Sequence, residues 1–426
     1  MHISHLFNWF RSPRALARWL VPMILTLATH RTFAAPAPLN VKEKDLAIAL
    51  AHTSRDLIKA TEGIGAIGSL LPRPWYETLH KAYLSTPVGD AWVTESRYED
   101  WQLVAARIVP CEPMSKSPLH EIDRYCWPEV RLVWQPIQRK IYLNGRYLDS
   151  SADDRAIHAI YPLRPEHFLP AREADSLRQL LKKIDDYPLP ATPFAPLNPE
   201  ELKSFESKRD ALSRQLLAAT LLLRAPSIPE TDYQGLGLRP ETFLDRPDFL
   251  VFKRRLEEFL TVYAAPSELK LLTSFSLPPG RDPVASDEWI FLRFTAQNAV
   301  LKPDAIQLYA PSNGRRVGPA LTQQRGSMRR DDDAFYEDSL SVDDQKEIAA
   351  NVMLWATDLS AMSPRLADRS QSLVPNTSCV SCHKLNALRF DFHNFSYLED
   401  QEITISPRVV RDVQLDLAWI KLLFQN

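Results

Sequence analysis

The chain has 426 residues, of which 45% are hydrophobic and 24% are charged, and its formal net charge is −2 at pH 7. This length is enough for two or three domains with hydrophobic cores. A charge so close to neutral gives no support for binding to nucleic acid or to an anionic membrane surface. Glycine is scarce, with 11 residues, and no glycine-rich phosphate-binding motif occurs.

The N-terminus has the pattern of a secretory signal peptide, residues 1–34. Arginines 11, 14 and 18 precede the apolar run Trp19–Ala28, and small residues at Thr32 and Ala34 suit a signal peptidase. The ten apolar residues are too few to cross about 30 Å of hydrocarbon as a helix. An uncleaved amphipathic anchor is the alternative. Cleavage after Ala34 leaves 47 basic and 53 acidic side chains, a formal charge of −6. We expect a periplasmic protein with no transmembrane span.

The first mature region, 35–187, mixes helix and strand. Apolar spacing predicts helices over Lys42–Ala60, Trp75–Leu84 and Ala174–Asp185. Dense β-branched and aromatic residues predict strands, and Asn144-Gly145 predicts a type I′ hairpin turn between two of them. The predicted strands are Val130–Trp134, Lys140–Leu143 and Arg146–Leu148.

Cys111 and Cys126 lie in this region, 15 positions apart. A disulfide between them is the expected state in an oxidising compartment, and it would contribute on the order of 3 kcal/mol. A labile redox pair is the alternative, but no sequence feature indicates a thiol of low pKa. We predict a structural disulfide.

A proline-rich connector, 188–199, leads to a second region, 198–325, that is helical first and then β-rich. Asn198-Pro199 with two following acids predicts a helix start, and the helix should continue to about Arg224. Another helix is expected over Asp248–Ala264. Strands are expected over Trp289–Phe294 and Ala305–Tyr309. A polar linker, 326–337, then precedes the last region, 336–426, where helices are predicted over Ser341–Asp358 and from Pro407 onward.

The last region contains Cys379-Val380-Ser381-Cys382-His383, which is the pattern of covalent haem attachment. Each thiol can add to one porphyrin vinyl group, and the adjacent imidazole can ligate the iron. A zinc site that adds His393 as fourth ligand and a redox dithiol are the alternatives. The loop-like sequence before Cys379 disfavours the dithiol. Export favours haem, because bacteria attach haem covalently outside the cytoplasmic membrane.

At this motif the chain resembles the c-type cytochromes, strongly over five residues and weakly over about the last 85. The resemblance implies one covalently bound haem c in a small, mainly helical segment, with His383 as the proximal iron ligand. Two departures stand out. The first predicted helix ends well before the motif, and no methionine follows Met362 to serve as a downstream distal ligand.

The sequence therefore leaves the identity of the distal ligand undecided. His393 is the only downstream histidine and lies among three phenylalanines; Met353, Met362 and Tyr397 are further candidates, and an open or water-bound iron is another.

The fold class that we expect is α+β. The leading hypothesis for function is one-electron transfer to a redox partner protein, docked by the large N-terminal region. A haem enzyme with an open iron site and a haem-containing sensor or binding module are the rivals. The sequence does not decide the oligomeric state.

Overall fold

A computed structural model describes most of the chain between residues 39 and 330 and part of its C-terminal end. The described residues are 39–51, 58–84, 97–114, 124–142, 146–152, 155–187, 196–243, 248–276, 290–303, short stretches between 307 and 330, 395–397 and 403–425. The chain divides into two compact units, residues 1–39 and 40–426, and all described residues except Leu39 belong to the second.

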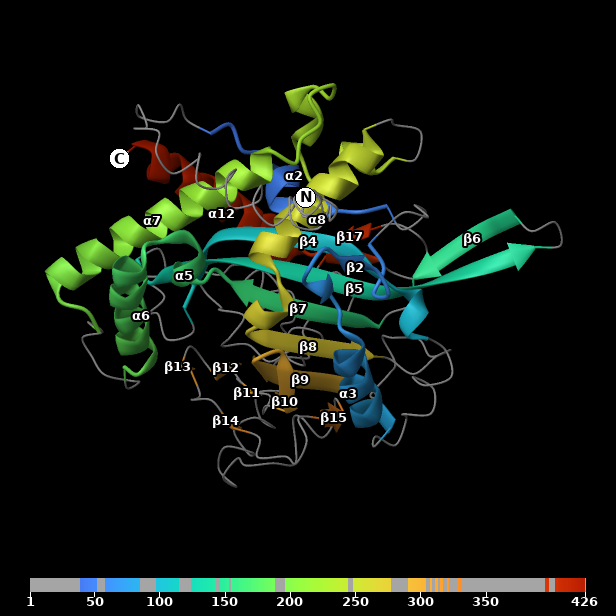
Figure 1. Cartoon of the computed structure of the whole chain (residues 1–426), viewed down its shortest axis with the longest axis horizontal. Helices are drawn as coiled ribbons and strands as arrows, with labels where there is room; N and C mark the ends of the chain where they lie inside the picture. The colour runs from blue at the N-terminus through green and yellow to red at the C-terminus, as the bar shows by residue number, and fades with distance from the viewer. Residues whose placement is uncertain are drawn as a thin grey trace, which may run out of the picture. The chain divides into compact units, whose positions relative to one another are not determined.

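The second unit is built on a nine-stranded antiparallel sheet (Figure 1). Seven strands follow one another in the order β1-β4-β5-β7-β8-β9-β10, while β6 pairs with β5 and β15 with β9. Their bounds are β1 Ala47–Ala49, β4 Trp101–Pro113, β5 Cys126–Tyr142, β6 Arg146–Ala152, β7 Ala156–Pro162, β8 Leu271–Ser276, β9 Ile290–Gln297, β10 Val300–Pro303 and β15 Met328–Arg330. The protein is thus α+β, as the sequence predicts.

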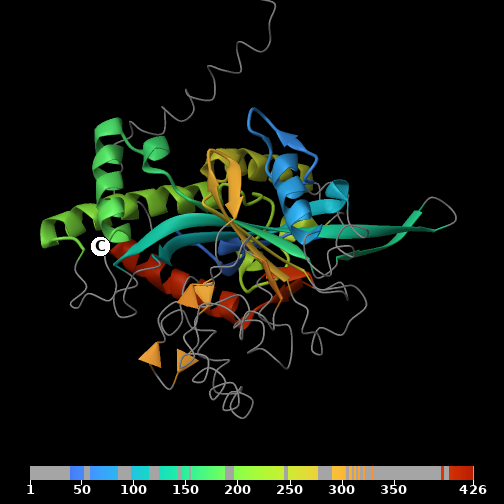
Figure 2. The ribbon, with the colours of Figure 1, turned by 90° about the horizontal axis from the view of Figure 1, so that it is seen from below.

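One face of the sheet, the apolar face, forms the core. Strand register aligns a row of fully buried residues across six strands: Ile48, Ala106, Leu132, Ala159, Leu272 and Phe294. Helices α3 (Arg73–Leu84) and α8 (Phe249–Tyr263) lie on this side (Figure 2). Tyr76 of α3 contacts Trp101 edge to face, with ring centroids 6.4 Å apart. Burial of this apolar surface is the main force that holds the sheet and helices together.

The opposite face, the mixed face, carries polar and apolar residues. Its aligned row is Ala47, Arg107, Arg131, Ile160, Leu271 and Thr295. Helix α12 (Pro407–Gln425) lies on this side of the sheet (Figure 2), where Asp416 forms a buried ion pair with Arg107. The short strands β16 (Phe395–Tyr397) and β17 (Ile403–Ile405) pair with each other, and β16 contacts β4 and β5.

Most predicted helices are confirmed, because their start signals are local. Helix α7 (Pro199–Leu221) begins where the sequence predicts: Asn198 Oδ1 accepts a hydrogen bond from the Glu201 amide at 2.9 Å, and Glu201 caps the Asn198 amide in return. Helices α6 (Ala171–Asp185), α3, α8 and α12 match their predicted ranges within a few residues. The predicted helix Ser341–Asp358 lies outside the described residues.

The helix predicted over Lys42–Ala60 is wrong. Within the described residues of this range, 42–51 and 58–60, there is one helical turn, α2 (Glu43–Leu46). The chain then forms strand β1, which pairs antiparallel with β4. Every residue of β1 is buried, so its apolar pattern does not alternate and can be mistaken for that of a helix. Residues 47–49 form a strand instead of a helix because they pair with β4, which lies far along the sequence.

The two predicted β regions belong to one sheet. Strand β7, from region 35–187, pairs directly with β8, from region 198–325. The predicted strand Val130–Trp134 and residues 140–142 of the predicted strand Lys140–Leu143 are parts of the single 17-residue strand β5, whose outer part pairs with β6. Leu143 and the predicted turn Asn144-Gly145 lie outside the described residues. Among the residues that the structure describes, no helix has the length and hydropathy that a membrane span needs.

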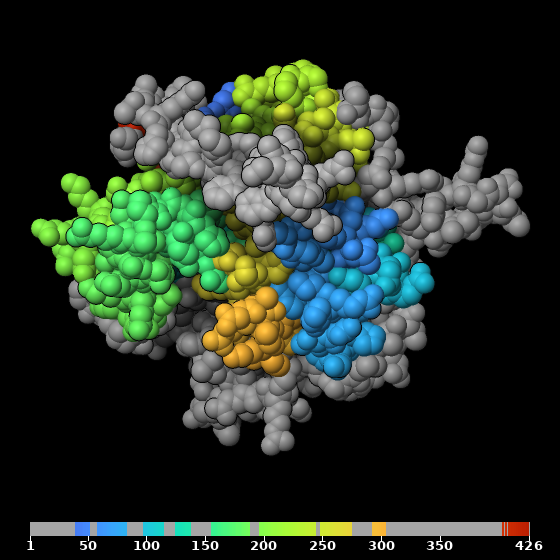
Figure 3. All heavy atoms as spheres, viewed as in Figure 1, coloured from blue at the N-terminus to red at the C-terminus, as the bar shows by residue number. Residues whose placement is uncertain are grey.

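The β9–β10 hairpin turns through Asn298 and Ala299, which both have positive φ, 52° and 60°. Trp75 of α3 donates an indole hydrogen bond to the Ala299 carbonyl at 2.6 Å. Figure 3 shows this orange segment directly beside the blue α3 on the molecular surface.

The remaining short elements are β2 Gly63–Ile64, β3 Gly68–Ser69, α5 Pro165–Phe168, and the 3₁₀ turns η1 Tyr98–Asp100, η3 Glu230–Tyr233, η4 Pro240–Thr242 and η5 Pro266–Glu268. Strands β11 to β14 are two residues long each and lie between 307 and 321.

Candidate functional site

The residues predicted to hold haem lie outside the described part of the structure. They are Cys379, Cys382 and His383, together with the distal-ligand candidates His393, Met353 and Met362. The remaining distal candidate, Tyr397, is the last residue of strand β16. The donor set itself suits a haem: two thiols for the vinyl groups and one imidazole for the iron. In the sequence, the described strand β16 begins 12 residues after His383.

The structure brings Cys111 and Cys126 to bonding distance, with their Cα atoms 4.9 Å apart. The pair joins the end of β4 to the start of β5, where Pro113 lies opposite Cys126. Both cysteines are buried, and Arg209 of α7 donates a hydrogen bond to Cys126 Sγ at 3.5 Å. Burial makes the sulfurs inaccessible to other thiols, so this disulfide fits the structural role that the sequence predicts.

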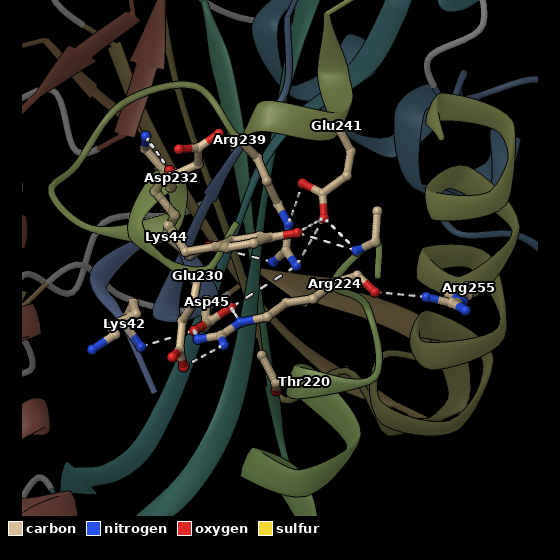
Figure 4. A network of polar contacts seen from close by, with 12 residues as sticks. Lys42, Lys44, Asp45, Thr220, Arg224, Glu230, Asp232, Arg239, Glu241 and Arg255 are labelled. Atoms are coloured by element: carbon tan, nitrogen blue, oxygen red, sulfur yellow. Dashed lines mark hydrogen bonds and ion pairs between the residues drawn. The ribbon is translucent and has the colours of Figure 1, made fainter. Parts of the chain in front are cut away.

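A buried polar cluster surrounds Tyr233 (Figure 4). We call Asp45, Arg224, Tyr233, Arg239 and Glu241 the Tyr233 cluster. Two guanidinium groups lie over the tyrosine ring, with the Cζ of Arg224 4.8 Å and that of Arg239 5.2 Å from its centroid. Its hydroxyl donates to Glu241 Oε1 at 2.6 Å and accepts from the Ala225 amide at 3.1 Å. Such stacking of cations on an aromatic ring is favourable when the groups are desolvated.

Each carboxylate in the Tyr233 cluster is satisfied by donors. Asp45 accepts from Arg224 Nε at 3.0 Å and from the Lys42 amide at 2.8 Å, and Arg239 approaches it to 3.9 Å. Glu241 accepts from Arg239 Nε at 3.0 Å and from the Ala225 amide at 3.1 Å. Asp45, Arg239 and Glu241 are fully buried. The buried Arg239 and the half-buried Arg224 thus balance the two buried anions Asp45 and Glu241, as a stable buried network requires.

The Tyr233 cluster joins three stretches that lie far apart in the sequence: α2, the end of α7, and the segment η3–η4. The segment is also tied to the sheet edge, since Leu238 bridges Ala49 and the Arg239 amide donates to the Ala49 carbonyl at 3.1 Å. Burial and the hydrogen bond to Glu241 raise the pKa of Tyr233 above its ordinary value. The phenol therefore stays protonated, and the cluster fits a structural role better than a catalytic one.

A second polar cluster lies on the mixed face of the sheet. Arg131 of β5 contacts Glu112 Oε1 at 2.8 Å and Glu129 Oε1 at 2.5 Å. Burial raises the pKa of Glu129, an effect that the neighbouring Arg131 opposes. For Arg131 burial alone would lower the pKa, but the two carboxylates outweigh it and raise the pKa. We call Glu112, Glu129 and Arg131 the Arg131 cluster.

His158 of β7 lies beside the Arg131 cluster, diagonal to Arg131 in the strand register. Burial, together with repulsion from the Arg131 guanidinium, lowers the pKa of His158 to about 4. The imidazole is therefore neutral at physiological pH. Perturbed titrating groups of this kind are frequent at functional sites, although structural networks produce them as well.

Sequence reasoning singled out no member of either cluster. A charged residue in the sequence does not show whether it will be buried, and some of its partners come from distant parts of the chain: Asp45 and Arg224 are 179 residues apart. Among the described residues, no group of three or more His, Cys, Asp and Glu side chains is arranged to hold a metal ion. No protein-family model, curated protein or solved structure shows significant similarity to this chain.

Proposed function

We propose that this protein is an exported monohaem c-type cytochrome-like protein that transfers one electron at a time to or from a periplasmic partner. The observation that carries the proposal is the motif Cys379-Val380-Ser381-Cys382-His383. Cys379 and Cys382 would form the thioether bonds, and His383 would ligate the iron from the proximal side.

Two independent features support a compartment in which haem c can be attached. The first is the N-terminal signal pattern of residues 1–34. The second is the pairing of Cys111 with Cys126, since disulfides persist in oxidising compartments and are rare in the cytosol. In such a compartment the two remaining cysteines, in CxxCH spacing, suit thioether attachment.

When bound, a haem supplies an iron that cycles between the ferric and ferrous states. The chain's own part would be to fix the ring through two covalent bonds and to set the iron's potential through its axial ligands. His383 is the proximal ligand in this proposal. His393 as distal ligand would give a low potential, whereas a methionine would give a higher one.

A haem enzyme with an open distal position is the second candidate. It is favoured by the absence of any methionine after Met362 and by the large α+β region, which a simple electron carrier does not need. A haem-containing sensor or binding module would share the open site but would not turn over a substrate.

Covalent attachment is tested by the pyridine haemochrome spectrum of denatured, acid-extracted protein. We expect one haem per chain in the wild type and no covalent haem in Cys379→Ala/Cys382→Ala. The matched control, Cys111→Ser/Cys126→Ser, removes the other two thiols and should keep the haem. Covalent haem in the first variant would refute the assignment of the motif.

The distal ligand is tested by the ferric visible spectrum. A low-spin spectrum that becomes high-spin in His393→Ala, with faster azide binding, supports ligation by His393 and the electron-transfer role. A wild type that is already high-spin and binds azide readily supports the enzyme or sensor alternatives. Peroxide turnover by purified holo-protein then separates the enzyme from the sensor.

A further inference from the structure

Six large apolar side chains are exposed in the part of the chain that the structure describes. Two of them, Val300 of β10 and Leu422 of α12, lie on separate elements. The other four lie at the end of α7, at the end of η4 and in the first turn of α8, and we call them the α7–α8 apolar patch: Leu222, Phe243, Leu250 and Val251. Leu222 is 73% exposed and Leu250 is 66% exposed. Large apolar groups gathered on a protein surface mark a site of contact with another protein or with a membrane.

The elements that carry the α7–α8 apolar patch are bonded to one another. Arg255 of α8 donates a hydrogen bond to the carbonyl of Arg224, just after α7, at 2.7 Å. Ser227, in the same stretch, donates to the carboxylate of Asp248 at the start of α8, and η4 contacts α8. Figure 3 shows these segments side by side, in yellow-green and yellow, at the top of the molecular surface. The four exposed side chains therefore belong to one region of the surface.

The folded unit also begins at this region. Arg224 Nη2 donates to the Asn40 carbonyl at 2.8 Å, and residues 1–39, the other compact unit, are joined to Asn40. The apolar run of the predicted signal peptide ends at Ala28, 12 positions before Asn40. A stretch of this length spans at most about 40 Å when it is fully extended. As long as the signal peptide is in the export membrane, the surface beside Asn40 is therefore kept close to the bilayer.

The composition of the α7–α8 apolar patch suits hydrocarbon better than a protein partner. Leucine, valine and phenylalanine side chains all favour transfer into a bilayer. Protein–protein hot spots are instead rich in tryptophan, tyrosine and arginine, and leucine and valine are under-represented there. The exposed charged residues nearby have both signs, among them Arg254 and Glu258 of α8 and Glu230 of η3. They form no field of one sign that selects an anionic lipid or a charged partner.

We propose that the α7–α8 apolar patch is a membrane-contact surface, through which the exported protein lies against a phospholipid bilayer. The patch side chains enter the boundary between headgroups and acyl chains, as the apolar face of an interfacial helix does. The contact is apolar, so its strength depends little on salt or on lipid charge. The proposal uses the export signal of the proposed function but not the haem.

Flotation with phosphatidylcholine vesicles tests the contact. We expect the mature protein, residues 35–426, to float with the vesicles and to bind them equally well at low and at high salt. Leu250→Asp/Val251→Asp should lower the partition constant about tenfold or more, because two inserted apolar groups become charged. Acidic residues in the first turn of a helix are favourable, so this variant should keep its fold, which urea unfolding checks. If it does not fold, Leu222→Gln takes its place.

The matched control carries the same two new charges outside the patch. Val300→Asp/Leu422→Asp should bind vesicles as the wild type does, since both residues are exposed on other elements. Equal losses in the two double variants, or a wild type that does not float, would overturn the proposal. Binding that needs phosphatidylglycerol and disappears at high salt would also overturn it, because it shows adsorption by charge.

A second copy of the chain is the competing occupant, and sedimentation distinguishes it. A wild-type dimer that becomes monomeric in Leu250→Asp/Val251→Asp, with no vesicle binding, would assign the patch to an interface between copies. Vesicle binding and haem content are separate readouts. A wild type without covalent haem refutes the proposed function and leaves the membrane contact standing, whereas a haem-containing protein that does not float refutes only the membrane contact.

Discussion

At the scale of single residues, the polar groups inside this protein are stable because they are paired. Asp45, Arg239 and Glu241 have no solvent exposure, and each has at least two polar partners within the Tyr233 cluster. Taking ions out of water costs several kcal/mol for each charge, and only close partners offset that cost. The cluster should therefore respond strongly to the loss of one member.

Arg239→Met should destabilise the fold by about 3 kcal/mol or more, because it removes the cation that pairs with the buried Glu241. It also removes the guanidinium from the rings of Tyr233 and Phe252, the latter 5.1 Å away. Urea unfolding followed by circular dichroism measures the change. The control is Arg178→Met, since Arg178 pairs with Asp175 and Glu166 on the surface and should contribute less than about 1 kcal/mol. Equal losses in the two variants would contradict this account.

His158 predicts a dependence of stability on pH. Its pKa is about 4 in the folded protein and near 6.5 in the unfolded chain, so between these values only the unfolded chain is protonated. Stability should fall as the pH decreases from about 6.5 to 4, by up to about 1.4 kcal/mol per unit from this residue. The groups around it are Arg131 and, through it, Glu112 and Glu129. His158→Gln should remove this part of the pH dependence in urea titrations, whereas His167→Gln on the surface should not.

At the scale of elements, the sequence predicts those structures whose signals are local. The cap at Asn198 with Pro199 and Glu201 predicts the start of α7, and Pro407 predicts that of α12. The predictions are poorer where pairing between strands that are distant in the sequence determines the secondary structure. Residues 47–49 were expected to be helical and form β1, and the 13-residue strand β4, buried on both faces, was not predicted. A continuous apolar run gives no periodicity that separates strand from helix.

The β9–β10 hairpin contains strain that one substitution should relieve. Ala299 has a φ of 60°, a left-handed conformation that costs a residue with a Cβ roughly 1–2 kcal/mol. Glycine avoids this cost but gains freedom in the unfolded chain, so Ala299→Gly should stabilise the protein by about 0.5–1 kcal/mol. The hydrogen bond from Trp75 to the carbonyl of residue 299 is kept. Thermal unfolding provides the measurement. Ala296→Gly, in strand β9, is the control and should destabilise.

At the scale of the whole molecule, the sequence indicates motifs of consecutive or nearby residues better than it indicates which distant elements pack together. The motif at 379–383 can be found from five consecutive residues, and the cysteine pair from the compartment that the N-terminus predicts. The common sheet of β7 and β8 and the pairing of Asp45 with Arg224 depend on contacts between residues more than 100 positions apart. No local pattern encodes such contacts, because they follow from register and packing across the complete sheet.

The buried pair of Arg107 and Asp416 joins the C-terminal helix to the sheet across 309 positions of sequence. Asp416→Leu should cost about 3–5 kcal/mol, because among the described residues it leaves the buried Arg107 guanidinium with backbone carbonyl partners, those of Leu46 and Ile108, in place of a carboxylate. Arg107→Met should also destabilise the protein, because it removes the cation that pairs with the buried Asp416. The double variant removes both charges, so its loss should be well below the sum of the two single losses. Urea unfolding gives the three values, and limited proteolysis shows whether α12 is cleaved first in Asp416→Leu. Additive losses would mean that the two side chains act independently, and α12 would then be held mainly by its apolar residues Val413, Ile420 and Leu423.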